Sequence, residues 1–484
     1  MNTQIRHVGY FLALLFVMLF IQVNNIQVLQ ADKLASDPRN NRNAVRDFSS
    51  PRGVIQTADG VVIAKSVPVD DEYKQLRTYP KGSLYGHITG FFSFTFGNEA
   101  LERQYNKDLT GKTYALSNID DLLTDRVRAN NVTITVEDKL QETARSALGD
   151  KRGAVVALNP KTGAVLAMYS NPSYDPSPLS AHDFQAVKKT RASLLKTPGN
   201  PLLPRAYQES YPPGSTSKVI TAASAFEQQP ALTKKRYPFN QSITPPRTDR
   251  PIRNFGGATC GGTLPELMRV SCNTGFAQMG LDLGSQNLST TANAFGFNKT
   301  PPLDMPFVAK SRFPAEQDLR RNPPFLAFAA IGQGNVSSTP LQMALVAAGI
   351  ANKGVIMQPH FLKEVRNPRG EIVRTARSEP WLRATSSGTA EEVTKLMQSV
   401  VSSGTAKAAA VQGVKVAAKT GTAQTTDDLI HAWLISFAPA DDPKIAVAVV
   451  VENQEGVSEA TGGRIAAPIA QQVMKAALDG ATVK

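Results

Sequence analysis

The tetrapeptide Ser215-Thr216-Ser217-Lys218 constrains this chain most, because it sets a serine and a lysine three residues apart before an apolar run. The run from Val219 to Ala223 predicts a helix, and residues three apart share one face of a helix. Lys218 can therefore lie one turn from Ser215 and reach its hydroxyl. A serine hydroxyl is a weak nucleophile at neutral pH and needs a basic neighbour. Taken alone, the motif is also compatible with an ordinary solvated helix start.

Two later stretches favour a catalytic role for the tetrapeptide over a solvated helix start. Ser271-Cys272-Asn273 follows an amphipathic segment, and Lys419-Thr420-Gly421-Thr422 follows a strand-like run at residues 414–418. The order S-x-x-K, S-x-N, K-T-G is the signature of penicillin-binding proteins and class A β-lactamases, with Cys272 where Asp is usual. Because three ordered motifs rarely coincide by chance, the pattern predicts a serine acyl-transfer enzyme.

Length and charge narrow the class of protein. A chain of 484 residues predicts two or three domains, and a hydrophobic fraction of 42% suits a folded protein with a large core. The net charge of +13 would suit nucleic-acid binding, but the Lys and Arg residues are scattered rather than gathered in a basic run. We therefore expect a solvated basic surface and no nucleic-acid partner.

The N-terminus carries an apolar run from Val8 to Val23, preceded by Arg6. Its length is close to the minimum for a membrane span, roughly 17–25 residues. No small-x-small cleavage pattern follows the run, which favours a retained anchor over a cleaved signal peptide. Basic residues beyond the run oppose a simple positive-inside count. A single-pass protein of the cell membrane with its catalytic domain outside is expected instead, from the substrate that the family resemblance described below implies.

The two cysteines, Cys260 and Cys272, can form a disulfide in an oxidising compartment. Thr263 and Glu266 form a capping box that predicts a short helix between them. A straight helix would hold its ends too far apart for a bridge, so the loop before the helix must fold back.

Strand and helix patterns divide the chain. Residues 36–50 are polar and predict a linker or stalk, and Asp59-Gly60 between apolar runs predicts a β-turn or hairpin. A further hairpin is predicted from the runs at residues 153–158 and 164–168. Near the end, the runs at residues 432–437 and 445–450 predict another, before a closing helix from about Ile465 to Leu478. Strands that bracket helices indicate an α+β arrangement.

The catalytic half resembles the transpeptidase domain of penicillin-binding proteins beyond its three motifs. Residues 153–176, Ile331-Gly332-Gln333-Gly334 and Thr339-Pro340 are similar to that domain's opening and internal segments. Arg52-Gly53, Asp59-Gly60 and residues 97–102 resemble the pedestal of class B members. Nearly the whole chain resembles the actinobacterial penicillin-binding protein A group.

This resemblance implies an α+β fold: a serine β-lactamase-like penicillin-binding domain with a sheet sandwiched by helices, a smaller mixed α/β pedestal and one transmembrane helix. The implied division is a cytoplasmic tail at 1–7, an anchor at 8–23, a noncatalytic pedestal or dimerisation-type domain at 24–148 and the transpeptidase domain at 149–484. The implied reaction is D,D-transpeptidation of peptidoglycan stem peptides, inhibited covalently by β-lactams.

The resemblance also implies catalytic roles. Ser215 attacks the penultimate D-Ala carbonyl to form an acyl-enzyme, and Lys218 is the general base if it is neutral. Burial beside a second cation such as Lys419 would lower the Lys218 pKa. Ser271 resembles the serine that passes a proton to the leaving amine, and Asn273 the residue that orients Lys218 and the donor peptide.

The substrate-binding roles fall on the third motif. Lys419 supplies positive potential for the substrate carboxylate, and Thr420 and Thr422 offer it hydroxyls. Gly421 lets the edge strand approach the substrate closely. The oxyanion hole is expected at the backbone N–H groups of Ser215 and Thr422.

Other readings remain open. Cys272 is expected to point away from the site, His431 to lie in a surface loop, and Trp433 in the core; no metal or cofactor is expected. A β-lactam hydrolase would need a Glu in an E-x-x-L-N loop, which Glu316 to Arg320 matches only in part. A D,D-carboxypeptidase and a noncatalytic wall-synthesis scaffold are further alternatives. By family analogy, the expected partner is a membrane glycosyltransferase that makes the glycan strand.

Overall fold

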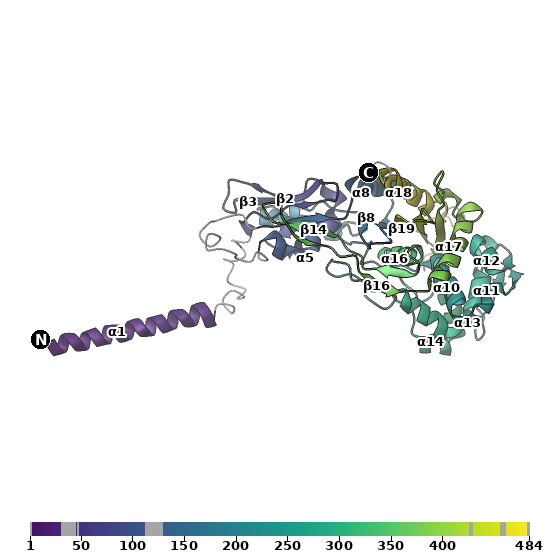
Figure 1. Ribbon diagram of the computed structural model, residues 1–484, viewed down its shortest axis with the longest axis horizontal. Coiled ribbons are helices and arrows are strands. Elements are labelled where there is room, and N and C mark those ends of the chain that lie inside the picture. Colours follow the sequence, from purple (N-terminus) through teal and green to yellow (C-terminus); the bar gives the residue numbers. More distant parts are fainter. Residues whose placement is uncertain are drawn as a thin grey trace. The chain divides into compact units, whose positions relative to one another are not determined.

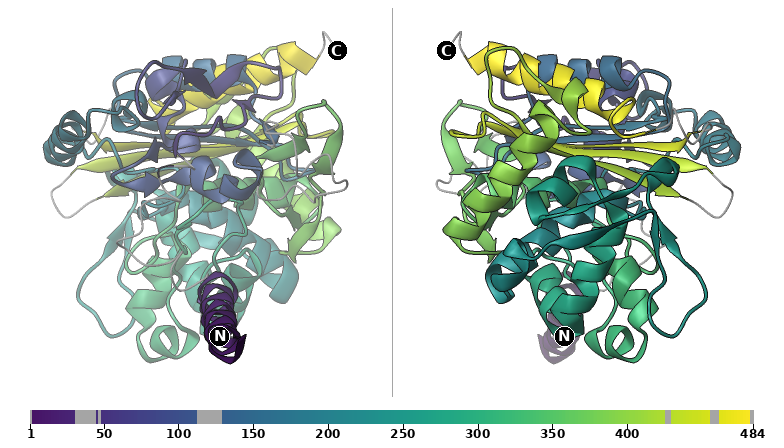
Figure 2. Two further views of the ribbon diagram at one scale, coloured as in Figure 1. Left: turned by 90° about the vertical axis from the view of Figure 1, so that its left-hand side faces the viewer. Right: turned by 90° about the vertical axis from the view of Figure 1, so that its right-hand side faces the viewer.

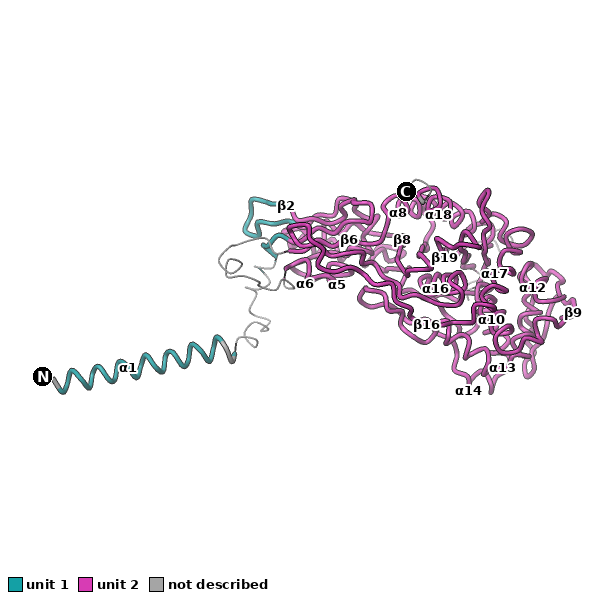
Figure 3. The backbone as a smooth tube through the Cα atoms, in the orientation of Figure 1, with its two compact units in different colours: residues 1–51, 67–76 teal, residues 52–66, 77–484 magenta. Residues whose placement is uncertain are grey.

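The computed structural model describes residues 2–30, 45, 48–111, 129–424, 429–454 and 461–481 (Figure 1). Two compact units are marked in Figure 3: residues 1–51 with 67–76, and residues 52–66 with 77–484. Most of the predicted linker at residues 36–50 lies outside the described residues. The second unit contains the whole five-stranded sheet and most of the six-stranded sheet described below.

The N-terminal helix α1 (Asn2–Asn24) continues into a π-helical turn, η1 (Asn25–Leu29). The apolar stretch Thr3–Gln27 has 25 residues, enough to cross a membrane by length and composition. The helix is longer than the predicted anchor at 8–23, because backbone hydrogen bonding continues through the polar residues on either side of the apolar run.

An antiparallel five-stranded sheet, here the catalytic sheet, has the strand order β17-β18-β19-β7-β8. Both predicted hairpins of the catalytic half are confirmed, because β7 pairs with β8 and β18 with β19. All nine residues of β18 are buried, as expected for a strand covered on both faces. The strands are β7 (Gly153–Leu158), β8 (Val165–Asn171), β17 (Ala417–Gln424), β18 (Ile430–Ala438) and β19 (Ile445–Gln454).

Helices cover both faces of the catalytic sheet. In Figure 2 the yellow helix α18 (Ala466–Ala481) lies on one face, and teal and green helices lie on the other. Helix α18, which confirms the predicted closing helix, packs against α8 (Asp138–Leu148) and against β19. On the opposite side α16 (Pro340–Ala351) packs against β7, β18 and β19. Thr339 caps α16 by accepting a hydrogen bond from the Gln342 amide at 3.1 Å.

Helix α8 belongs with the catalytic sheet, although its sequence range falls inside the expected pedestal, 24–148. The Gln141 amide donates to the Met168 carbonyl at 2.9 Å and accepts from the Met168 N–H at 2.8 Å. These bonds fasten α8 to the edge strand β8. The expected boundary between the pedestal and the transpeptidase domain, at residue 149, therefore assigns α8 to the pedestal although α8 covers the catalytic sheet.

The other helices of the catalytic half surround the motifs. They are α9 (Phe184–Lys196), α10 (Lys218–Gln228), α11 (Ala231–Lys234), α12 (Leu264–Val270), α13 (Asn273–Ala294), α14 (Glu316–Arg321), α15 (Pro323–Ala330) and α17 (Ser387–Ser402). Two-stranded sheets pair β9 (Tyr237–Asn240) with β12 (Cys260–Gly262), β10 (Ser242–Ile243) with β11 (Ile252–Arg253), and β13 (Val355–Met357) with β16 (Pro380–Arg383).

A second sheet, the pedestal sheet, has the order β15-β14-β6-β1-β2-β3. Strands β1 and β2 form the hairpin predicted at Asp59-Gly60. The hairpin β14–β15 comes from the catalytic half of the sequence, yet Val365 of β14 lies opposite Val132 of β6. The pedestal is therefore not one continuous segment. The strands are β1 (Ile55–Gln56), β2 (Val62–Pro68), β3 (Gln75–Thr78), β6 (Asn131–Ile134), β14 (Leu362–Arg366) and β15 (Ile372–Thr375).

Short elements complete the pedestal: α4 (Gly86–Thr89), β4 (Phe92–Ser93), β5 (Gly97–Asn98), α5 (Ala100–Gln104) and α6 (Asn106–Leu109). Within it, Glu102 receives two buried arginines. Arg52 Nη2 lies 2.8 Å from Glu102 Oε2, Arg77 Nε lies 2.6 Å from Oε1, and the three side chains are at most 1% exposed. Arg52 also stacks over the Phe92 ring, 4.0 Å from its centroid.

Candidate active site

Ser215 lies in a 3₁₀ turn, η4 (Gly214–Ser217), that leads directly into α10. Gly214 has φ 53°, and a side chain there would approach the Thr422 carbonyl to 3.1 Å. The Gly214 amide donates to the Gly332 carbonyl at 2.9 Å. Glycine is needed for this positive φ and close approach, which present Ser215 at the start of a helix beside β17.

Lys218 is fully buried under the serine. Its Nζ donates to the Ser271 carbonyl at 2.7 Å, to Ser271 Oγ at 3.3 Å and to Asn273 Oδ1 at 2.7 Å. In the part of the chain that the structure describes, no hydrogen bond joins Lys218 Nζ to Ser215. The hydrogen bonds of Lys218 Nζ go instead to the second motif, including Asn273, which the family resemblance implies to orient Lys218.

Ser271 joins the two lysines. Its hydroxyl accepts from Lys419 Nζ at 2.7 Å as well as from Lys218. The residue lies between α12 and α13 with φ 60° and ψ 43°, a left-handed conformation uncommon for a residue with a side chain. Such strain is often found where a side chain must be held for function.

The electrostatics of the two lysines follow from burial. Burial lowers the pKa of Lys218 well below its usual range, and the neighbouring Lys419 lowers it further. Burial also lowers the pKa of Lys419, to about 7. Among the described residues, no carboxylate lies within ion-pairing distance of either Nζ. The site therefore favours a neutral lysine at physiological pH, which is the condition that the sequence analysis set for Lys218 to act as a base.

Strand β17 presents its residues on alternate sides. Thr420 and Thr422 line the cavity, whereas Lys419 lies buried and also donates to the Thr420 carbonyl at 2.9 Å. A side chain at Gly421 would meet the Pro213 carbonyl at 2.9 Å. Gly421 thus admits the loop before the serine, and the close approach of the substrate to this strand stays a prediction.

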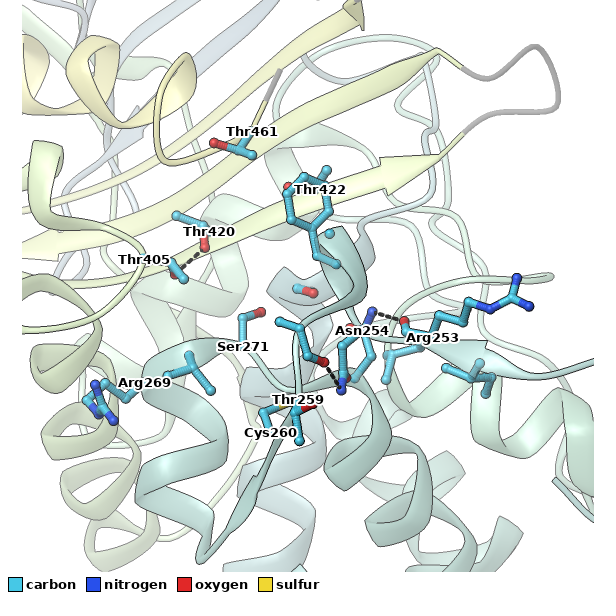
Figure 4. A pocket seen from close by; sticks show the side chains of 18 of the residues that line it. Arg253, Asn254, Thr259, Cys260, Arg269, Ser271, Thr405, Thr420, Thr422 and Thr461 are labelled. Carbon is cyan, nitrogen blue, oxygen red and sulfur yellow. Dashed lines mark hydrogen bonds between the residues drawn. The ribbon is translucent and has the colours of Figure 1, made fainter. Parts of the chain in front are cut away.

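A cavity of about 980 Å³ opens over these motifs. Ser215, Ser271, Asn273, Thr420 and Thr422 line it, whereas Lys218, Lys419 and Gly421 are buried and do not line it. Figure 4 shows Ser271, Thr405, Thr420, Thr422 and Thr461 around it. Its volume suits a ligand of peptide or drug size.

Sequence reasoning missed several residues of the cavity. Thr405 shares a hydrogen bond with Thr420 at 2.6 Å between their hydroxyl oxygens. Thr461 also lines the cavity and is followed by Gly462, where a side chain would meet the Trp433 carbonyl at 2.1 Å. The glycine after the threonine was the signal available in the sequence. Arg253, Asn254, Phe255 and Arg269 are further lining residues.

The second motif rests on a platform made by a disulfide and an asparagine. Cys260 and Cys272 are joined, with their Cα atoms 5.8 Å apart. Strand β12 brings Cys260 back toward the end of α12, as the sequence required, and the Thr263 amide donates to Glu266 at 2.6 Å in the predicted capping box. The buried Asn254 accepts from the Thr274 amide at 3.0 Å.

Three residues outside the motifs, which the sequence also singled out, do not line the cavity. His431 was expected in a surface loop, but it lies on β18 and is 9% exposed, because the strand begins at Ile430. Trp433 is fully buried, as predicted. Glu316, the candidate hydrolase base, accepts from Ser285 Oγ at 2.8 Å and does not line the cavity. Within the described ranges, no group of three or more His, Cys, Asp or Glu could hold a metal ion.

A helix-covered antiparallel sheet with a serine–lysine pair beside its edge strand defines the class of serine acyl-transfer enzymes that react with penicillins. Residues 153–475 match the family model of the penicillin binding protein transpeptidase domain, and the chain belongs to this family. Residues 52–132 match the penicillin binding protein A dimerisation domain.

Relatives of known name extend over the full length. The peptidoglycan D,D-transpeptidase PbpA of Mycolicibacterium smegmatis is 40% identical and is covered over 99% of both chains. Its namesake in Mycobacterium tuberculosis is 38% identical over 99% of this chain and 100% of the relative. Penicillin-binding protein A of M. tuberculosis, solved as a ceftriaxone acyl-enzyme complex, superposes with a TM-score of 0.84 at 37% identity, over 90% of this chain and 100% of that one.

Proposed function

We propose that the chain is a serine-type peptidoglycan D,D-transpeptidase that cross-links stem peptides through an acyl-enzyme and is inhibited covalently by β-lactams. The observation that carries this proposal is the buried Lys218, whose hydrogen bonds to Ser271 and Asn273 unite two of the motifs beside Ser215. The full-length relatives named D,D-transpeptidases and the β-lactam acyl-enzyme structure support the same activity.

In the first half-reaction, Ser215 Oγ attacks the penultimate D-Ala carbonyl carbon. Neutral Lys218 takes the hydroxyl proton, the carbon–nitrogen bond to the terminal D-Ala breaks, and that amine leaves with a proton passed through Ser271. In the second, an acceptor amine attacks the acyl carbon and Ser215 recovers its proton. The bond from Lys218 to Ser271 and the bond from Lys419 to Ser271 support this proton path.

Substrate binding falls to the cavity wall. Thr420 and Thr422 offer hydroxyls to the substrate carboxylate, with Lys419 supplying positive potential beneath them. The N–H groups of Ser215 and Thr422 form the oxyanion hole, where such donors typically stabilise the transition state by about 3–4 kcal/mol each. Gly214 keeps the serine turn close to the Thr422 carbonyl, which supports this placement.

The same fold also hosts hydrolytic enzymes. A β-lactam hydrolase needs a base that activates water at the acyl-enzyme, and Glu316 lies outside the cavity lining. A D,D-carboxypeptidase differs only in using water as the acceptor. The match of residues 52–132 to a dimerisation domain of penicillin-binding protein A favours transpeptidation.

We assign residues 1–7 to a cytoplasmic tail, 8–23 to the anchor, 24–148 to the pedestal and 149–484 to the transpeptidase domain. Helix α8 precedes the last boundary but packs on the catalytic sheet, and β14–β15 follow it but join the pedestal sheet. The catalytic domain lies outside the cell membrane, where the peptidoglycan substrate is. A membrane glycosyltransferase of the wall-synthesis machinery is the partner, contacted through anchor and pedestal. The apolar stretch Thr3–Gln27 supports the anchor.

The test is the intact mass of the full-length protein in detergent after exposure to penicillin, beside a Ser215→Ala variant. A stable adduct on the wild type alone is expected. An adduct that forms and disappears within seconds would instead indicate a hydrolase. A folded wild type without an adduct would refute the assignment of Ser215.

A further inference from the structure

Glu452, on β19, is a buried carboxylate that the proposed acyl transfer does not use. It is 6% exposed and receives three donors. Its Oε1 accepts from Arg205 Nε at 2.7 Å and from the Tyr211 hydroxyl at 2.5 Å, and its Oε2 pairs with Arg152. A buried carboxylate is costly unless it is well paired, so this arrangement needs a reason.

Tyr211 connects the carboxylate to the nucleophile, because it lies four residues before Ser215. Burial raises the pKa of the Tyr211 hydroxyl, and Glu452 raises it further, so the hydroxyl stays protonated and donates. The ring is also held edge-on against His431 and Trp433, at centroid distances of 5.3 and 6.0 Å. Its hydroxyl and its ring are thereby both constrained.

The backbone between Tyr211 and Ser215 is fixed as well. The Tyr211 N–H donates to the Ser338 carbonyl at 3.0 Å, and the Ser338 N–H donates back at 2.8 Å. The Pro212 carbonyl accepts from Trp433 Nε1 at 3.1 Å. A displacement of the Tyr211 ring would therefore be transmitted through a short, hydrogen-bonded segment to the serine.

The segment from Tyr211 to Ser215 is also held against β17, the strand that carries the third motif. Trp433 on β18 lies directly opposite Gly421 on β17, and its indole holds the Pro212 carbonyl. Thr422 and Ser215 are expected to supply the two oxyanion donors, so their separation depends on how the serine loop sits against β17 and β18. Glu452, on the next strand, fixes the Tyr211 end of that loop.

We propose that Glu452 and Tyr211 form a positioning pair that sets Ser215 against β17 for attack on the bound carbonyl. This inference rests on the proposed acyl-transfer function. Neither residue touches the substrate. The pair acts on the rate of acylation, because a small displacement of a nucleophile costs reactivity while the cavity that binds the ligand is unchanged.

The Tyr211→Phe variant tests the pair most cleanly. It removes one hydroxyl while Glu452 keeps both arginines, so the fold is retained. With full-length protein in detergent and penicillin G, stopped-flow kinetics separates the dissociation constant of the noncovalent complex from the first-order acylation constant. We expect acylation to slow by roughly tenfold, with the dissociation constant within about twofold of wild type.

Tyr207→Phe is the matched control, because Tyr207 is also buried and donates its hydroxyl to a carbonyl, that of His87, at 3.2 Å. It should acylate within about twofold of wild type. Glu452→Gln should slow acylation in the same direction, and the double variant with Tyr211→Phe should be no slower than the slower single variant. If Glu452→Gln does not fold, the acylation constant of Tyr211→Phe alone tests the positioning pair.

Two results would overturn the inference while leaving the proposed function intact. One is normal acylation by folded Tyr211→Phe, and the other is an equal loss in Tyr207→Phe. A general structural role would lower the melting temperature and weaken noncovalent binding together with acylation. Absence of any adduct on the wild type would overturn both the function and this inference.

Discussion

Two buried pairs of basic side chains differ in what faces them. In the pedestal, Arg52 and Arg77 share the carboxylate of Glu102, at 2.8 and 2.6 Å. Beneath the candidate nucleophile, Lys218 and Lys419 share the neutral hydroxyl of Ser271, at 3.3 and 2.7 Å. Both pairs are shielded from solvent.

The difference shows two ways to bury basic groups. Burial alone would raise the pKa of the Glu102 carboxyl, but Arg77 and Arg52 outweigh it and hold that pKa below its usual range. Arginine remains charged in proteins, so the pedestal keeps its charges and compensates them. Lysine can lose its proton, so the active site can relieve the cost of burial by neutralising a lysine. The pedestal arrangement suits structure, and the other suits proton transfer.

The largest expected effect comes from removing the base. Lys218→Met should slow acylation of full-length protein by penicillin by about 10²–10⁴-fold, because general-base catalysis contributes that much. Its free energy of unfolding should fall by only about 1–3 kcal/mol, because the variant leaves the Ser271 carbonyl and Asn273 Oδ1 without this donor but leaves no buried charge unpaired. Stopped-flow acylation and urea unfolding measure the two quantities. Lys415→Met, at a lysine 71% exposed, is the control; equal acylation by both variants would refute the role.

The opposite pattern is expected in the pedestal. Glu102→Gln should lower the free energy of unfolding by about 3–5 kcal/mol, because two buried guanidinium groups lose their only shared carboxylate among the described residues. Urea unfolding monitored by fluorescence measures this loss. Glu142→Gln, at a carboxylate 48% exposed, should change little. Similar losses from both variants would contradict the contrast between the two pairs.

Ser271→Asp would place a carboxylate beside Lys218 and Lys419, as Glu102 lies beside the two arginines of the pedestal. A carboxylate there favours the charged form of both lysines and removes the neutral base. Acylation at pH 7 should then be roughly tenfold slower than in Ser271→Asn, the neutral match. Asp and Asn both tolerate the left-handed φ of 60° at this position. Equal rates at pH 7, with a common pH profile, would show that neutrality of the lysines is not required.

The smallest change, at most about 1.4 kcal/mol for each pH unit, is a pH dependence of stability. The folded pKa of Lys419, about 7, lies below its unfolded value of about 10.4, so the folded state binds fewer protons between these values. Stability should therefore rise with pH across this window in the wild type, relative to Lys419→Met. The lowered Glu102 pKa instead predicts a loss of stability as pH falls below about 4.3. Urea unfolding from pH 3 to 10 measures both; a constant difference from Lys419→Met between pH 7 and 10 would contradict the first.

The sequence predicted the parts of the site that depend on local order. A serine three residues before a lysine, a glycine in an edge strand and a capping box all act within one turn or strand, so they could be read directly. Local order does not give the partners of Lys218, because Ser271 and Asn273 are 53 and 55 residues away and meet it through the packing of α10 against α13. The role of Asn273 beside Lys218 was implied by the family resemblance alone. The three motifs predicted that these residues meet in one site, but not which atoms form hydrogen bonds there.

The fold shows the same limit. Alternating patterns predicted the catalytic hairpins, but a strand pattern does not name a distant partner, and β14 pairs with β6 across more than two hundred residues. Likewise an amphipathic helix does not say which sheet it covers, and α8 joins the catalytic sheet through Gln141. His431 was misplaced because the apolar run used for prediction began one residue after it.

The position of the β14–β15 hairpin in the sequence determines when, during synthesis, the pedestal sheet can be completed. Synthesis delivers β6 (Asn131–Ile134) first and β15 (Ile372–Thr375) only after Ser215 and Ser271 have emerged. At 5–20 residues per second, the ribosome leaves β6 with an open edge for roughly tens of seconds. The pedestal begins translation first but completes its sheet late, and a nascent chain halted before β14 would expose an edge on which another copy can pair.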